Sequence, residues 1–356
     1  MLTVPDVEWS SSNTAIAKVD SEGLVRGISK GTVTITGRAT YNDTDNDTDN
    51  DIEFEQSIIL QVLKKAIIIV PGLMGSRLVA GEKISDDILT GTDLWATSTD
   101  ALLDGTYDEK QKAMTRISAL EFNSDFQSVR TVDTVSDLDR TCTDNYYGVK
   151  SVYEELYRDL ETNYNNLYDI RFFNYDWRYS NTVSAENLAT FINVNNYDKV
   201  VLIAHSMGGL VASKFLANAG TAASTMGRKV EDCIFVASPL LGSPISAYIL
   251  GSSDLSALQD FELSGFALFI YSCMAAFSGS YIQIKNLLKY LPSLYELLPS
   301  AFYFDTYDID DNNNRYNWYL CSEDKLPYST FQATNNELKS QSSHFSSTLI
   351  DQSIVF

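Results

Sequence analysis

Residues 199–210 read Lys-Val-Val-Leu-Ile-Ala-His-Ser-Met-Gly-Gly-Leu, and this stretch decides the fold of the larger part of the chain. The apolar run over 200–203 is typical of a buried strand. The segment Ala204-His205-Ser206-Met207-Gly208-Gly209, with small residues on both sides of the serine, follows this run. Apolar residues then recur at helical spacing, namely Leu210, Val211, Phe215 and Leu216. The pattern predicts a strand, a sharp turn with a serine at its tip, and a helix.

A serine at the tip of such a turn has the pattern of a nucleophile elbow. The turn strains the backbone of the serine, so its neighbours must be small for the strand and the helix to pass closely. Ala204 stands where the motif Gly-x-Ser-x-Gly has its first glycine, and Gly208 and Gly209 keep the other side open. The N-terminus of the helix favours a developing oxyanion. Ser206 is therefore the candidate nucleophile.

Composition narrows the class of protein. With 356 residues, we expect one large and one small domain, or two domains. The net charge of −21 argues against a nucleic acid as partner and against electrostatic docking on an anionic membrane. The four cysteines show no metal-ligand spacing, and we expect neither a metal nor a cofactor. These cysteines are Cys142, Cys233, Cys273 and Cys321, of which Cys233 is expected to be a buried core thiol.

From Ala66 onward, predicted strands alternate with predicted helices. We expect buried strands over 66–70, 168–173, 200–203 and 233–237, and helices over 149–164 and 185–193 and after the elbow. The apolar face of the helix over 149–164 is predicted to comprise Val149, Val152, Tyr153, Leu156 and Leu160. This order predicts an α/β fold with a doubly wound parallel sheet.

Residues 1–63 follow a different pattern, in which apolar and polar residues alternate between regularly placed glycines. The strings over 9–20, 23–27 and 30–36 resemble bacterial immunoglobulin-like domains of group 2. The resemblance implies a small all-β sandwich of a secreted or surface protein of bacteria. Such domains begin with strands upstream of the tryptophan, here Trp9, so we expect a partial, N-terminally truncated copy and an extracytoplasmic protein whose signal peptide lies upstream of Met1.

The acidic segment 42–51 carries an aspartate at every second position from Asp43. Such alternation suggests a calcium loop. However, the turn glycine is missing, and Phe54 stands where the bidentate glutamate would lie. A solvated hairpin tip is the favoured interpretation, and Ser57–Leu63 is then predicted to be the last strand of the sandwich.

Three loops at predicted strand ends resemble the lecithin:cholesterol acyltransferase family of α/β-hydrolases. They are Ile69-Val-Pro-Gly-Leu-Met-Gly-Ser-Arg-Leu78, Phe173-Asn-Tyr-Asp-Trp-Arg178, and the elbow together with Ala237-Ser-Pro-Leu-Leu-Gly-Ser243. Residues 291–300 are also similar to a segment of its bacterial members. The resemblance implies an α/β-hydrolase sheet with cap segments over 64–356, following the sandwich of 1–63.

The resemblance also implies an activity, which is acyl transfer or ester hydrolysis on lipids through an acyl-enzyme on Ser206. The family places two backbone N–H groups at the oxyanion, which here correspond to Leu73 and Met207. The implied partner is a lipid or acyl ester, with contact to a membrane or lipid surface through a cap. The alternative is a cell-surface binding or adhesion module with a catalytically inactive hydrolase fold.

Caps over Ser206 are expected between Arg77 and Thr143 and between Pro244 and Tyr303, with a lid or a buried cap helix over 263–277. For Asp176-Trp177-Arg178, a structural corner with a buried ion pair is favoured over a substrate contact.

The base of a catalytic triad is harder to assign, because the chain has only two histidines. His205 leaves the elbow on the side away from the serine oxygen, and His344 reads as an exposed position on a helix. By the resemblance, the catalytic Asp and His lie beyond Phe356, which predicts that the hydrolase is truncated at its C-terminus.

Overall fold

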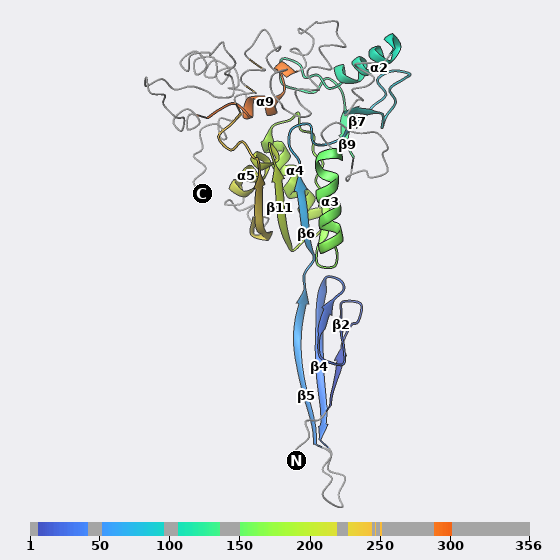
Figure 1. The fold of residues 1–356 in the computed structure, drawn as a ribbon, viewed down its shortest axis with the longest axis vertical. Helices are drawn as coiled ribbons and strands as arrows, with labels where there is room; N and C mark the ends of the chain where they lie inside the picture. The colour runs from blue at the N-terminus through green and yellow to red at the C-terminus, as the bar shows by residue number, and fades with distance from the viewer. Residues whose placement is uncertain are drawn as a thin grey trace, which may run out of the picture.

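The computed structural model describes residues 6–41, 52–95, 106–135, 150–218, 227–243, 246, 250 and 288–300. A slender β unit formed by the N-terminal residues lies at one end of these parts, and an α/β unit follows it along the long axis (Figure 1). The chain passes from the first unit to the second between β5 (Ile52–Val62) and β6 (Lys65–Val70).

The N-terminal unit consists of two small antiparallel sheets packed around a short apolar core. One sheet has the order β1-β4-β5, and the other pairs β2 with β3. The bounds of the strands not yet given are β1 (Val7–Ser11), β2 (Ala17–Val19), β3 (Val25–Gly27) and β4 (Gly31–Tyr41). Ala17, Val33 and Ile35 are buried between the sheets. This arrangement fits the predicted N-terminal β domain.

Strand β5 begins earlier than predicted, because it pairs with β4 along its whole length, from Gly31 with Val62 to Tyr41 with Ile52. The predicted strand over 57–63 did not include the first half of β5, because charged and apolar residues are mixed there. The acidic segment 42–51, interpreted above as a hairpin tip, lies outside the described residues.

The second unit is built on a parallel sheet of order β10-β6-β11-β12. Its other strands are β10 (Asp169–Phe172), β11 (Lys199–His205) and β12 (Val230–Val236). The first strand, β6, is central; the chain adds β10 on one side of it and then β11 and β12 on the other. This confirms the predicted α/β class and parallel sheet, in which all four strands lie close to their expected positions.

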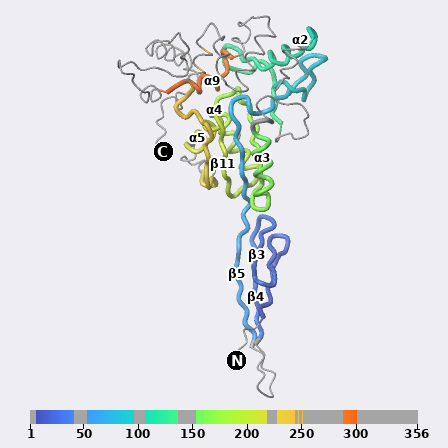
Figure 2. Tube along the Cα trace, in the orientation of Figure 1, coloured from blue at the N-terminus to red at the C-terminus, as the bar shows by residue number. Residues whose placement is uncertain are grey.

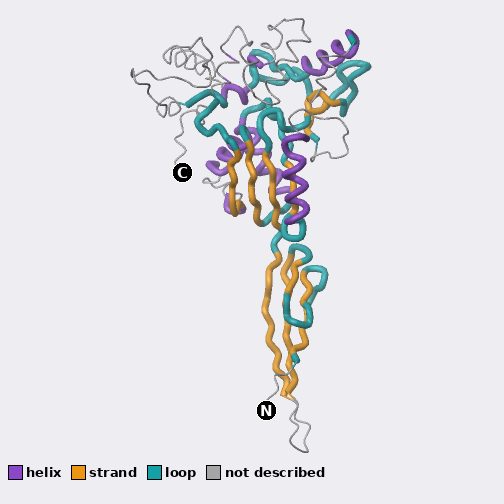
Figure 3. The backbone as a smooth tube through the Cα atoms, viewed as in Figure 1, coloured by secondary structure: helices purple, strands orange, loops and turns teal. Residues whose placement is uncertain are grey.

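Helices cover both faces of this sheet (Figure 3). Helix α3 (Lys150–Tyr164) packs on the face formed by Ile67, Ile69 and Phe172. Helices α4 (Asn181–Val194) and α5 (Gly208–Asn218) pack on the opposite face, where Ile68 and Val70 point. Successive strand side chains point to opposite faces, so a continuous apolar run such as that of β6 is needed when both faces are covered.

Two helical details differ from expectation. The prediction that Leu156 belongs to the buried face of α3 is wrong, since Leu156 is exposed and the buried face centres on Tyr153 and Tyr157. The side chains of Val149 and Val152 lie outside the described part. Helix α4 begins four residues earlier than expected, because the Ser180 side chain accepts a hydrogen bond from the Thr182 amide and caps the helix.

A third group of elements lies beyond the C-terminal ends of the parallel strands (Figure 2). It contains the antiparallel sheet β8-β7-β9. Its elements are β7 (Leu78–Ala80), β8 (Asp93–Trp95), α2 (Tyr107–Ser118) and β9 (Val132–Thr134), and the short α9 (Pro292–Glu296) lies nearby. These elements belong to the expected cap segments, whereas the proposed lid over 263–277 lies outside the described residues. Within the described ranges, no helix is both long and apolar enough to cross a membrane.

Candidate active site

The predicted elbow has the geometry of a strained turn. Strand β11 ends at His205 and helix α5 begins at Gly208. Between them, Ser206 has a φ angle of 52°, which is in the left-handed region that side chains other than glycine rarely adopt. The Ser206 amide donates to the carbonyl oxygen of Val236 at 2.9 Å. The turn is thereby fastened to the neighbouring strand β12, and the serine stays partly exposed at its tip.

The two glycines after the serine are required by close packing. A Cβ atom on Gly208 would lie 2.3 Å from the carbonyl oxygen of Val70, at the end of β6. A Cβ atom on Gly209 would lie 2.1 Å from Oγ of Ser238. Both distances are far inside van der Waals contact. The small residues recognised in the sequence thus allow α5 to start directly against the ends of β6 and β12.

The loop after β6 approaches Ser206 from the other side. A Cβ atom on Gly72 would lie 2.7 Å from Cβ of Ser206 and 3.2 Å from its Oγ. Leu73 is the next residue of this loop, and Met207 follows the serine. Among the described residues, the backbone amides of Leu73 and Met207 donate to no acceptor. The two amides that the family resemblance implies as oxyanion donors therefore lie on the two segments that meet at Ser206, and neither has a hydrogen-bond acceptor among the described residues.

Aromatic side chains hold the backbone of this loop in place. The Tyr175 hydroxyl donates to the carbonyl oxygen of Pro71 at 2.7 Å, and the Trp95 indole donates to that of Met74 at 2.8 Å. The Trp177 indole donates to the carbonyl oxygen of Ser76 at 3.2 Å. All three rings are almost completely buried. Such donors in an apolar surrounding restrict the loop to one conformation.

A fourth aromatic residue connects the loop to the elbow. The Tyr153 hydroxyl accepts the Gly72 amide at 2.9 Å and lies 2.7 Å from Nδ1 of His205. Burial lowers the pKa of His205 and raises the pKa of Tyr153 to about 12. The contact agrees with the expectation that His205 does not serve Ser206 as a base. His344, the other histidine, lies outside the described residues.

The Asp176-Trp177-Arg178 segment has the contacts of a structural corner. The Arg178 guanidinium pairs with the Asp176 carboxylate through Nε at 2.9 Å and Nη2 at 2.6 Å. Its Nη1 donates to the carbonyl oxygen of Leu120 and to Oγ of Ser128. Arg178 is completely buried. These contacts join the sheet to the cap segment and support the favoured structural interpretation.

Two further site predictions concern metals and cysteines. In the parts of the chain that the structure describes, no three His, Cys, Asp or Glu side chains are grouped as metal ligands. The prediction that Cys233 is a buried core thiol is wrong, because it is only half-buried on β12, the last strand of the described sheet. Partial burial still raises the pKa of its thiol to about 11.

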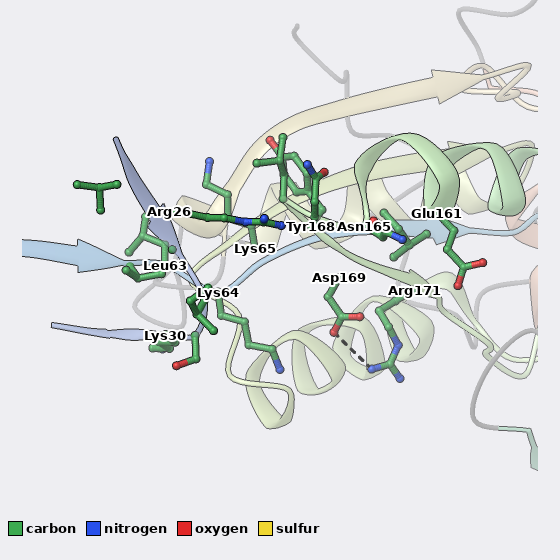
Figure 4. Close-up of a pocket in the computed structure, with 18 of the residues that line it drawn as sticks. Arg26, Lys30, Leu63, Lys64, Lys65, Glu161, Asn165, Tyr168, Asp169 and Arg171 are labelled. Carbon is green, nitrogen blue, oxygen red and sulfur yellow. Dashed lines mark ion pairs between the residues drawn. The ribbon is translucent and has the colours of Figure 1, made fainter. Parts of the chain in front are cut away.

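A cavity of about 980 Å³ lies away from the elbow, where the N-terminal unit meets the parallel sheet. Figure 4 shows charged side chains around it, including Lys30, Lys64 and the Asp169–Arg171 ion pair. Lys65 and Asp169 begin their strands, whereas Ser206 follows the end of one. The cavity and the serine therefore lie at opposite ends of the sheet.

Two family models match the chain. The bacterial Ig-like domain (group 2) matches residues 3–49, and the lecithin:cholesterol acyltransferase family matches residues 88–347. A comparison with curated proteins found no match. The second model spans more than half of the chain and includes the elbow, although it begins after the loop that carries Leu73. Both matches confirm the composition expected from the sequence motifs, and the chain belongs to the lecithin:cholesterol acyltransferase family, whose general activity is acyl transfer or hydrolysis on lipids.

Proposed function

We propose that this protein transfers or hydrolyses acyl esters of lipids through an acyl-enzyme on Ser206. The observation that carries the proposal is the backbone of Ser206, which is held at a φ angle of 52° between a parallel strand and a helix. Strain of this kind persists where the surrounding structure imposes it, and it is common at functional sites. Family membership supplies the lipid class of the substrate.

In the proposed reaction, Oγ of Ser206 attacks the acyl carbonyl carbon as its proton passes to a base. The carbonyl oxygen becomes an oxyanion, which accepts hydrogen bonds from the amides of Leu73 and Met207. Collapse of this intermediate expels the alcohol of the donor ester, which takes up the proton. Water or an acceptor alcohol then attacks the acyl-enzyme by the same steps and releases Ser206.

The choice of base separates this function from its alternative. His205 is the only described histidine, and its Nδ1 contacts Tyr153. Oγ of Ser206 has no hydrogen-bond partner among the described residues. An active enzyme therefore requires a base from another part of the protein. Without one, the fold would serve as a binding or adhesion module of the cell surface, which is the second candidate function.

A fluorophosphonate probe distinguishes the two functions, because it modifies only an activated serine. We expect the full protein to be labelled and Ser206→Ala to remain unlabelled. Ser206→Ala should also lose hydrolysis of phospholipids and of nitrophenyl esters, since loss of a serine nucleophile typically lowers kcat by about 10⁶-fold. Circular dichroism should show that the variant is folded. Absence of labelling and turnover in the folded wild-type protein would contradict the enzyme and support the binding module.

We further propose that the protein acts outside the cytoplasm of a bacterium. The match of residues 3–49 to a bacterial Ig-like domain supports this, because such domains are typical of secreted and surface proteins. Fractionation of the native host, with immunodetection of the protein in the extracytoplasmic fractions, tests the proposal. Detection in the cytoplasm alone would contradict it.

A further inference from the structure

We infer that Tyr153 and His205 position the oxyanion hole, acting as one buried unit that sets the loop carrying Leu73 against the elbow carrying Met207. The inference rests on the proposed function, because the oxyanion hole is part of that proposal. It adds two side chains that contact no reacting atom and whose role is to keep two separate backbone segments in register.

The hydrogen bonds of Tyr153 carry the inference. Its hydroxyl contacts the Gly72 amide at 2.9 Å and Nδ1 of His205 at 2.7 Å. Gly72 directly precedes Leu73 in the oxyanion loop, and His205 is separated from Met207 only by Ser206. One hydroxyl group therefore contacts both the residue directly before Leu73 and the residue two positions before Met207.

The directions of these bonds follow from their chemistry. The Gly72 amide can only donate, so the Tyr153 oxygen accepts that bond, and the hydroxyl proton is free for Nδ1 of His205. Burial favours the neutral form of both side chains, since it lowers the pKa of His205 and raises the pKa of Tyr153 to about 12. His205 then has its proton on Nε2 and an acceptor at Nδ1.

The surroundings of Tyr153 restrict the Tyr153–His205 pair to a single arrangement. The ring is 3% exposed and packs edge-on against Phe172 and against the His205 imidazole. A hydroxyl group in such a place cannot exchange its partners for water without a large penalty. Because Tyr153 belongs to helix α3, its hydrogen bonds hold the loop and the elbow at fixed positions relative to that helix.

The chain provides a matched control one helical turn further along α3. Tyr157 is 5% exposed, and its hydroxyl donates to the carbonyl oxygen of Ile170 at 3.0 Å, in the middle of β10. Tyr153→Phe and Tyr157→Phe each remove one oxygen from a buried ring on the same helix. Only the first change removes a contact with the oxyanion loop.

Kinetics on the full protein provide the first test. Tyr153→Phe should lower kcat by about 10- to 100-fold with KM nearly unchanged, because misplacement of donors impairs the transition state and not the bound substrate. Tyr157→Phe should stay within about twofold of wild type in kcat, since its hydroxyl contacts neither segment of the site. His205→Asn, which keeps an acceptor near the place of Nδ1, should retain more activity than His205→Ala.

A spectroscopic test does not depend on turnover. The chain has only two histidines, so nitrogen NMR of protein labelled at histidine resolves them readily. His205 should show the Nε2–H tautomer, and its Nδ1 resonance should shift in Tyr153→Phe but not in Tyr157→Phe. Equal kinetics of the two tyrosine variants, or an unchanged Nδ1 resonance, would overturn the inference. Full activity of Ser206→Ala would instead overturn the proposed function.

Discussion

Gly208 lies so close to Val70 that a Cβ atom on the glycine would come within 2.3 Å of the valine carbonyl oxygen. The same atom would lie 2.5 Å from the carbonyl oxygen of Pro71. Both obstacles are backbone atoms of the strand β6 and the loop after it, so they cannot swing away as a side chain could. The start of helix α5 thus packs directly against the start of the loop that carries Leu73.

Gly208→Ala should therefore displace either the elbow or the loop. We expect the free energy of unfolding to fall by about 3 kcal/mol, the upper end of the usual penalty for overpacking, because the obstacles are backbone atoms. Urea denaturation measures the change. Gly91→Ala is the control for an added methyl group without a clash, because Gly91 has no neighbour within 4 Å of an added Cβ, although its positive φ of 84° brings backbone strain of its own. Its backbone strain alone should amount to about 1 kcal/mol. Equal losses in the two variants would show that close packing is not the cause.

Removal of Arg178 should destabilise the α/β unit strongly. Arg178→Met leaves the Asp176 carboxylate without its cation and Leu120 without its donor, and loss of one partner of a buried ion pair lowers the free energy of unfolding by about 3–5 kcal/mol. Thermal and urea unfolding measure this loss. The matched control is Arg38→Met, since Arg38 pairs with Glu55 at 2.8 Å on an exposed surface. The control should change stability by less than about 1 kcal/mol. A mild effect of Arg178→Met would contradict the structural role.

Glu296 should make stability depend on pH. Burial raises the pKa of its carboxyl group, while hydrogen bonds from Ser180 and from the Asn181 amide oppose this rise. The folded state then binds the proton more tightly than the unfolded state. The contribution of Glu296 to the free energy of unfolding is complete below the ordinary pKa of a carboxyl group. This contribution is lost as the pH rises through the raised pKa of the folded state. The loss is about 1.4 kcal/mol for each pH unit that separates the folded-state pKa from the unfolded-state pKa.

Glu296→Gln tests this pH dependence, because glutamine keeps a hydrogen-bonding group for each neighbour but has no charge. Urea unfolding of both proteins from pH 5 to pH 8 should show that wild type loses stability relative to the variant as the pH rises. Parallel pH profiles would mean that Glu296 titrates normally.

Lys30 of the N-terminal unit contacts the α/β unit through its side chain. Its Nζ pairs with the Asp198 carboxylate at 2.8 Å and donates to Oδ1 of Asn196 at 3.1 Å, while Asp198 also accepts the Lys64 amide. Both side chains of the ion pair are partly exposed, so Lys30→Ala should change the free energy of unfolding by less than about 1 kcal/mol.

The expected effect of Lys30→Ala is a looser arrangement of the N-terminal unit, measured as a broader distance distribution in small-angle X-ray scattering. High salt should shift wild type in the same direction, because it screens the ion pair. Arg38→Met serves again as the control. A scattering profile of Lys30→Ala identical to that of wild type would show that other contacts set the arrangement.

The sequence by itself determined those features that depend on neighbouring residues. Strand β11, the serine turn and helix α5 could be predicted because the apolar periods and the small residues around Ser206 lie within a single short stretch. The order of strands and helices could be predicted for the same reason, since the spacing of apolar residues within a segment indicates whether that segment is a strand or a helix. The family motifs are local as well, and the family matches include the motifs at 9–36, at 173–178 and around the elbow.

Tertiary structure alone decided how these stretches meet. Tyr153 is 52 residues from His205 and 81 from Gly72, and no period in the sequence pairs a hydroxyl with either of them. The prediction for Leu156 placed it on the wrong face of α3, because hydrophobicity does not distinguish it from the tyrosines that contact the sheet. Hydrogen bonds between distant segments depend on the packed positions of whole helices and strands. Those positions follow from the sum of many weak contacts, which no short stretch of sequence contains.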